Sequence, residues 1–163
     1  MSLGQVVRAQ SLAALFLLLV PGAIAFYIAG VWSIGPRYVG RTRVYDATEL
    51  SMYGLIMTGK SIPMDVTGKD VLVENGVLRW TDLECSACTI RIPGGVSHSR
   101  VGVMQGSLTL GNVDSSVIGA EHIVLNGTVT NSTGIVGTID RGSIGPGNSI
   151  QIAPEQWHKA RRK

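Results

Sequence analysis

The sequence predicts an all-β protein, a small β-solenoid or glycine-rich β domain, preceded by one N-terminal transmembrane helix. Three observations predict it: a 24-residue apolar run near the N-terminus, an apolar segment that recurs every 15 to 19 residues, and abundant glycine. Of the 163 residues, 45% are hydrophobic, 15% are charged and 21 are glycine. This balance excludes a disordered chain, and two cysteines are too few for a disulfide scaffold.

Composition divides the chain into five stretches. We expect an N-terminal tail (1–10), a transmembrane helix (11–35), a linker with irregular β structure (36–69), a glycine-rich β domain that carries the repeats (70–153), and a basic C-terminal tail (154–163).

The predicted membrane span contains no charged residue between Arg8 and Arg37. Residues 11–34 measure about 36 Å as a helix, enough to cross a hydrocarbon core of about 30 Å. Side chains typical of the membrane–water interface lie at or just after its C-terminal end, namely Tyr27, Trp32, Arg37, Arg41 and Arg43. The three arginines outnumber Arg8, which predicts a single-pass protein with a cytoplasmic C-terminal domain. The alternative is a secretory signal that is cleaved after Ala25 and leaves an envelope protein.

Four similar segments follow residue 70. They are VLVENGV (71–77), IRIPGGV (90–96), LTLGNV (108–113) and IVLNGTV (123–129), and each reads apolar, any, apolar, glycine-containing turn, valine. Their starts lie 19, 18 and 15 residues apart, about one coil of a solenoid, and IQI (150–152) is a partial copy 27 residues later. Residues 81–156 contain no Phe, Tyr or Trp, which suits a narrow core of Val, Ile and Leu. A β-sandwich or barrel of hairpins is the alternative.

These repeats resemble the bactofilins, small bacterial β-helix proteins that polymerise into membrane-associated scaffolds. The likeness covers roughly residues 70–152 and rests on the period and the class of residue at each position. It implies a β-helix fold and self-association.

Residues 36–69 have less regular patterning. We expect strands over 38–45 and 52–58, with a turn or short helix over 46–50 between them. Tyr38, Tyr45 and Tyr53 are the aromatic residues of this stretch. They are predicted either to close the first coil or to contact a partner or lipid.

Few residues suggest chemistry. Cys85 and Cys88 form a C-x-x-C pair, which is half of a zinc site or a redox pair. We expect two small residues packed at a coil corner, with an interchain metal or redox role as the alternative. The chain has no G-x-S-x-G elbow and no phosphate loop. The sequence therefore predicts a protein that is not an enzyme and that needs no cofactor.

The C-terminal tail concentrates basic residues. Its candidate lipid or partner contacts are Trp157, Lys159, Arg161, Arg162 and Lys163. Charges over 81–152 are nearly balanced, so we expect no nucleic-acid binding. The expected partners are the lipid bilayer, other membrane-protein subunits and a second copy of the chain. The expected function is that of an accessory subunit that stabilises a larger membrane complex, for example an energy-transducing or photosynthetic one, with a self-assembling scaffold as the alternative.

Overall fold

The computed structural model describes residues 21, 36–56, 62–63 and 69–154. The predicted transmembrane helix (11–35) lies outside these residues except for Pro21, and the basic tail lies outside them from residue 155 onward. Within the described ranges, no helix is long and apolar enough to cross a bilayer. Residues 36–163 form a compact unit of their own.

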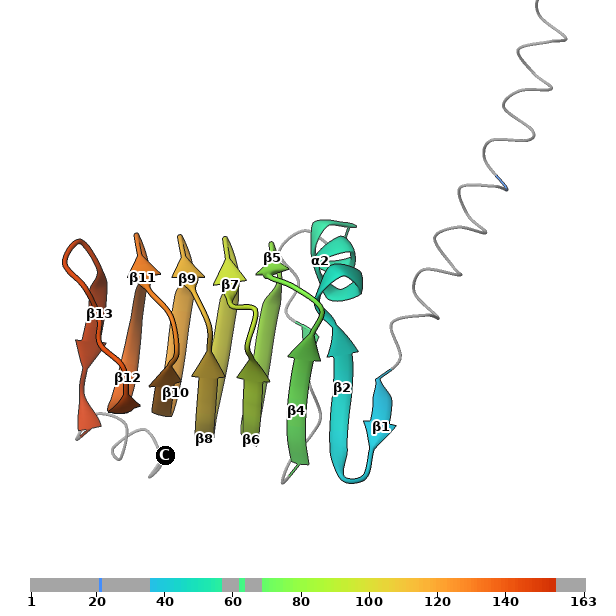
Figure 1. Ribbon diagram of the computed structural model, residues 1–163, viewed down its shortest axis with the longest axis horizontal. Coiled ribbons are helices and arrows are strands. Elements are labelled where there is room, and N and C mark those ends of the chain that lie inside the picture. Colours follow the sequence, from blue (N-terminus) through green and yellow to red (C-terminus); the bar gives the residue numbers. More distant parts are fainter. Residues whose placement is uncertain (1–20, 22–35, 57–61, 64–68, 155–163) are drawn as a thin grey trace, which may run out of the picture. The chain divides into compact units, whose positions relative to one another are not determined.

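This unit is a β-solenoid of about five turns, which confirms the predicted fold (Figure 1). The larger sheet contains β1 (Arg37–Val39), β2 (Thr42–Asp46), β3 (Ile62–Pro63), β4 (Lys69–Glu74), β6 (Asp82–Ile92), β8 (Arg100–Leu110), β10 (Val117–Leu125), β12 (Thr133–Arg141) and β13 (Ser149–Ile152). A second row contains β5 (Leu78–Arg79), β7 (Val96–Ser97), β9 (Val113–Asp114) and β11 (Val129–Thr130). Except for the β1–β2 hairpin, neighbouring strands are parallel, as in stacked coils and unlike a barrel of hairpins.

The strand register confirms the predicted repeats. Val71 pairs with Ile90, Ile90 with Leu108, and Leu108 with Ile123, and all four side chains are fully buried. The column continues to Ile139, which pairs with Ile123.

The partial copy at 150–152 was placed wrongly in the repeat. Ile150 pairs with Gly134, and Gly134 with Ile118, so β13 continues the first halves of the long strands, whereas the repeat lies in their second halves. Both halves alternate apolar and polar residues, so alternation alone does not tell them apart.

Glycine is required at the turns that end each repeat because successive coils touch there. A Cβ on Gly94 would overlap the carbonyl oxygen of Gly76 in the preceding coil. The glycine in the turn of each repeat therefore indicates where successive coils stack.

A ladder of buried hydroxyls runs along the adjacent corner. We call Thr81, Ser99, Ser116 and Ser132 the hydroxyl ladder; their exposed fractions are 2%, 6%, 3% and 1%. In each step a backbone N–H donates to the hydroxyl of the next coil: 3.1 Å from Thr81 to Ser99, 3.2 Å from Ser99 to Ser116 and 3.2 Å from Ser116 to Ser132. The ladder satisfies buried amides that the sheets leave unpaired.

Helix α2 (Ala47–Ile56) lies at the N-terminal end of the solenoid. Asp46 caps it, because its Oδ1 accepts hydrogen bonds from the N–H groups of Thr48 (2.8 Å) and Glu49 (3.2 Å). The hydrogen bond from Asn75 is the main cause that lowers the pKa of the Asp46 carboxyl. The predicted strand over 52–58 was wrong: residues 52–56 are helical, and the Asp-x-x-Glu start at Asp46 is the capping signal that explains it.

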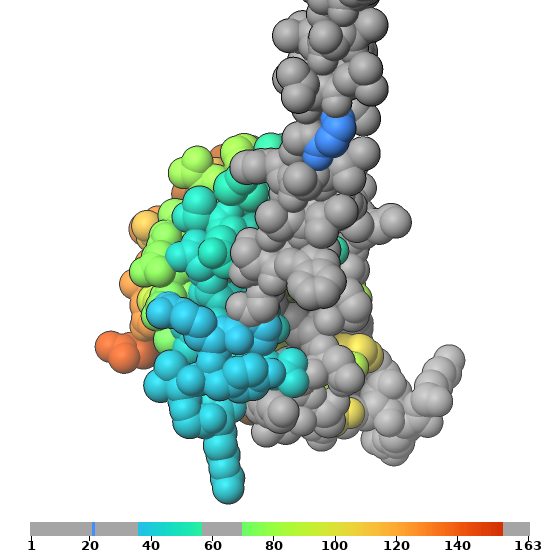
Figure 2. All heavy atoms as spheres, turned by 90° about the vertical axis from the view of Figure 1, so that its right-hand side faces the viewer, coloured from blue at the N-terminus to red at the C-terminus, as the bar shows by residue number. Residues whose placement is uncertain are grey.

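The N-terminal end is closed by small and aliphatic side chains. Val44, Ala47 and Leu50 are buried there, while Tyr45 and Tyr53 are only half-buried, so the predicted tyrosine plug is replaced by aliphatic residues. In Figure 2, which views the solenoid from this end, β1, β2 and α2 (blue to teal) lie in front of the later coils.

The C-terminal end differs. β13 is the last strand of the larger sheet, and among the described residues no strand pairs with its outer edge. Ile152 continues the inward-facing column of Val136 and Ala120, yet 56% of it is exposed because no further coil covers it.

Candidate functional site

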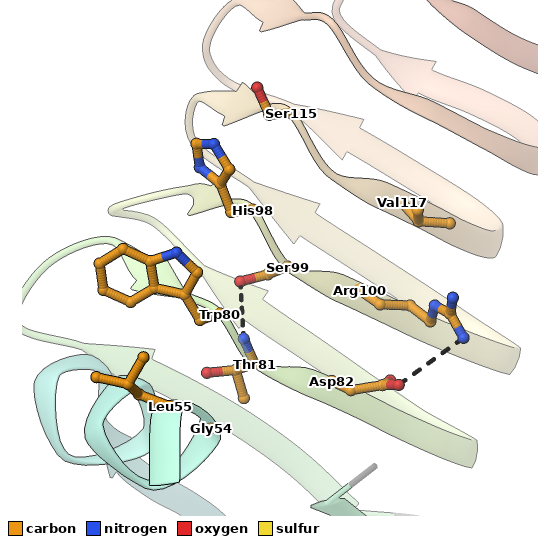
Figure 3. A pocket seen from close by; sticks show the side chains of 10 residues that line it. All are labelled: Gly54, Leu55, Trp80, Thr81, Asp82, His98, Ser99, Arg100, Ser115 and Val117. Carbon is orange, nitrogen blue, oxygen red and sulfur yellow. Dashed lines mark hydrogen bonds and ion pairs between the residues drawn. The ribbon is translucent and has the colours of Figure 1, made fainter. Parts of the chain in front are cut away.

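An open groove of about 600 Å³ lies along the corner beside α2 (Figure 3). It crosses three successive coils and ends against the last turn of the helix. Its lining residues are Gly54, Leu55, Trp80, Thr81, Asp82, His98, Ser99, Arg100, Ser115 and Val117. Leu55 and Trp80 also line a neighbouring hollow of about 350 Å³, so the two side chains form a ridge between the two depressions.

The rim of the groove is built from Trp80, His98 and Ser115, which hold one equivalent corner position in successive coils, and Asn131 holds that position in the next coil. Trp80, His98, Ser115 and Asn131 all have left-handed backbones, with φ of 51°, 49°, 47° and 48°. Non-glycine residues are uncommon in this region, and a large one such as Trp is strained there. The left-handed turn swings the chain from the short second row into the next long strand.

Two contacts fix the helical wall of the groove. A Cβ on Gly54 would overlap the carbonyl oxygen of Trp80, so only glycine lets α2 approach the corner this closely. The Thr81 hydroxyl also donates to the Leu50 carbonyl oxygen at 3.2 Å. The helical wall is thus positioned by close packing at Gly54 and by the hydroxyl of Thr81, the first residue of the hydroxyl ladder.

A carboxylate and a guanidinium lie at the other side of the groove. The side chain of Asp82 is 21% exposed, and its Oδ2 lies 3.9 Å from an Arg100 nitrogen, which makes a long ion pair. Asp82 Oδ1 is buried and has no hydrogen-bond partner. Burial is the main cause that raises the pKa of the Asp82 carboxyl, and Arg100 opposes it. The ionised form of Asp82 is therefore under-solvated.

The arginines predicted for the membrane interface lie on the β1–β2 hairpin. Arg37 pairs with Glu74, and Arg41 is exposed in the turn. The Arg43 guanidinium lies 5.8 Å from the centre of the Tyr38 ring, which is itself 62% exposed. The structure thus brings five of the predicted contact residues together on one hairpin, because the half-buried Tyr45 also lies on β2.

The remaining predicted residues are dispersed. Tyr53 lies half-buried on α2. Cys85 and Cys88 are joined in a disulfide and are 4% and 6% exposed, so both sulfurs are shielded inside the coil. Five others lie outside the described residues in the C-terminal tail, and two in the span: Trp157, Lys159, Arg161, Arg162 and Lys163, with Tyr27 and Trp32.

Neither of the two described histidines, His98 and His122, forms an acid–base relay with the side chains around it. His98 contacts the Ser97 hydroxyl through Nδ1 at 2.9 Å. The Nδ1 of His122 faces both the Thr138 hydroxyl (2.8 Å) and Asp140 (3.4 Å), whereas a relay uses the two ring nitrogens for different partners. Among the described residues, no group of three or more His, Cys, Asp or Glu side chains could hold a metal ion.

Comparison of the chain with protein-family models, curated proteins and solved structures finds no match. Sequence reasoning missed the groove, although one signal was present. Ser or Thr recurs at 81, 99, 116 and 132, always directly after a corner residue and at the spacing of the coils.

Proposed function

We propose that the chain is a non-enzymatic structural subunit of a membrane-attached assembly and that it joins this assembly through the C-terminal end of its solenoid. The observation that carries the proposal is the end coil, because no described strand pairs with the outer edge of β13. β13 has the sequence Ser-Ile-Gln-Ile, carries no charge and leaves Ile152 exposed. An unpaired, uncharged edge strand is a template for another strand.

The opposite end is protected by contrast. The edge strand β1 has three residues, it runs antiparallel to β2, and it is flanked by the charges of Arg37 and Arg41. Short, charged edges of this kind oppose pairing. Association through one end favours a docked subunit or a closed pair of copies over an open filament.

The hairpin supports attachment to a membrane. It directly follows the apolar residues 11–35, and it exposes 62% of Tyr38 and 67% of Val39 beside Arg41. Aromatic and apolar surface mixed with arginine suits the lipid headgroup region. In this proposal residues 11–35 span the bilayer once.

A self-assembling scaffold is the second candidate, and β13 favours it as well. Two copies can pair their β13 edges about a two-fold axis, because the same four residues then face each other. This arrangement closes as a dimer, and the bactofilin-like polymer would need a second open end.

The test is extraction of the full chain from its native membrane in mild detergent, followed by native mass spectrometry. Ile152→Lys places a charge on the exposed edge, and Met104→Lys is the matched control because Met104 is 63% exposed on a middle coil. We expect a complex of fixed stoichiometry that Ile152→Lys dissociates and Met104→Lys leaves intact. A homodimer alone would select the scaffold, and a lone monomer from the native membrane would refute both candidates.

A further inference from the structure

We propose that the corner groove binds a short carbohydrate chain, with the Trp80 indole as a stacking platform and with Asp82 and Arg100 as its polar contacts. This inference is independent of the proposed function, because it rests on residues at the other end of the solenoid. Figure 3 shows Trp80 and Leu55 at one side of the groove and the Asp82–Arg100 pair at the other.

Trp80 is the first reason. Half of its surface is exposed, although its backbone has a φ of 51°, a conformation in which a bulky residue is strained. Equivalent corners hold His98, Ser115 and Asn131, and Asn tolerates this conformation well. The half of the indole that stays exposed beside α2 is a flat aromatic face on which the C–H face of a sugar ring can stack.

Asp82 is the second reason. Its Oδ1 is a buried acceptor without a donor, which is an unfavourable arrangement that a ligand donor would relieve. The terminal torsion of an aspartate is soft, so rotation about it allows the carboxylate to meet a donor in the groove. A sugar hydroxyl would donate to Asp82 and accept from Arg100, whose side chain is 60% exposed.

The backbone of the groove excludes the usual mode of peptide binding. The corner amides donate to the next coil: Trp80 N–H to Ser97 O at 3.4 Å, His98 N–H to Asp114 O at 3.1 Å, and Ser115 N–H to Thr130 O at 3.0 Å. An extended peptide recognised by strand addition needs such groups unpaired. Recognition here must come from side chains.

The length of the groove sets the size of the ligand. Its lining residues belong to three coils, and two strand spacings of about 4.8 Å give about 10 Å, the length of two linked sugar rings. The mixture of one aromatic face, one carboxylate and one guanidinium matches a ligand with apolar ring faces and hydroxyl edges.

The test uses the full chain in a polyoxyethylene detergent, because detergents with sugar headgroups would compete. Trp32→Phe and Trp157→Phe leave Trp80 as the only tryptophan, and its emission is excited selectively at wavelengths that the tyrosines do not absorb. Chitotetraose, cellotetraose and tetragalacturonate are the probes, with octaproline as the peptide competitor. We expect a saturable change in Trp80 fluorescence with at least one oligosaccharide.

Calorimetry on variants then locates the site. Trp80→Asn keeps a residue suited to the left-handed corner, and it should weaken binding at least tenfold; Asp82→Asn should weaken it several-fold. Met104→Asn, on a middle coil away from the groove, should leave affinity unchanged. Absence of saturable binding by all three oligosaccharides, unchanged affinity in Trp80→Asn, or binding of octaproline alone would overturn the proposal.

Discussion

The hydroxyl ladder makes a quantitative prediction for Ser116→Ala. The Ser116 hydroxyl accepts the Ser99 N–H at 3.2 Å and donates to the Asp114 carbonyl oxygen at 2.7 Å. The carbonyl keeps a second donor, because His98 N–H also reaches it at 3.1 Å. The substitution therefore leaves one buried donor unpaired, the Ser99 amide, and an unpaired buried amide costs about 1–3 kcal/mol.

The measurement is urea unfolding of the full chain in nonionic detergent, followed by circular dichroism. We expect the free energy of unfolding to fall by about 1–3 kcal/mol, and hydrogen exchange to speed up at the amide of Ser99. Ser132→Ala should cost about the same, because it orphans only the Ser116 amide. The control is Ser107→Ala, since the half-buried Ser107 hydroxyl makes only a 3.4 Å contact with Thr89.

A loss below about 0.5 kcal/mol for Ser116→Ala would refute the reasoning, because variation of that size is ordinary for surface positions. An equal loss in Ser107→Ala would also refute it, since the effect would then come from any serine on the strands.

Three further predictions follow from other contacts. Gly54→Ala should lower the free energy of unfolding by about 1–3 kcal/mol in urea melts despite better helix propensity, because α2 must move off the corner. Asp46→Ala should cost about 1 kcal/mol of cap energy. The pKa of the Asp46 carboxyl is lowered in the fold, so its contribution to the free energy of unfolding is complete above the ordinary pKa of 3.8 and is lost as the pH falls through the folded pKa. In urea melts, the free energy of unfolding of Asp46→Asn should therefore fall less in acid than that of the unmodified chain. Alkylation without reductant should modify neither Cys85 nor Cys88, and intact mass checks it.

The repeat could be predicted from sequence because burial and turn chemistry coincide in each coil. Val71, Ile90, Leu108 and Ile123 each precede a turn containing glycine, and the structure pairs them in the predicted order. β13 lacks such a turn, since Ile152 is followed by Ala153 and Pro154. The missing turn, and not the apolar alternation, shows that β13 continues the first halves of the long strands.

The groove was not predicted, because the Ser or Thr that recurs at each corner marks the corner itself and not the wall beside it. Trp80, His98 and Ser115 are 18 and 17 residues apart, and only coil stacking places them on one rim. The helical wall of the groove depends on Gly54, because glycine lets α2 approach the Trp80 carbonyl oxygen closely. Gly54 matters because it has no side chain, and a single sequence does not show which glycine is needed for such a close contact.

The distance between the two proposed sites makes a final prediction about their independence. From the strand after Trp80 to β13 the register advances four coils, about 19 Å at 4.8 Å per strand. Substitutions farther apart than about 10 Å without shared partners act additively. The double variant Trp80→Asn/Ile152→Lys should therefore lose carbohydrate binding as Trp80→Asn does and lose assembly as Ile152→Lys does, when calorimetry and native mass spectrometry are applied to one preparation. An oligosaccharide that shifts the assembly equilibrium of the unmodified chain would contradict this, because the rigid stack of coils would then transmit a change from the corner to the end.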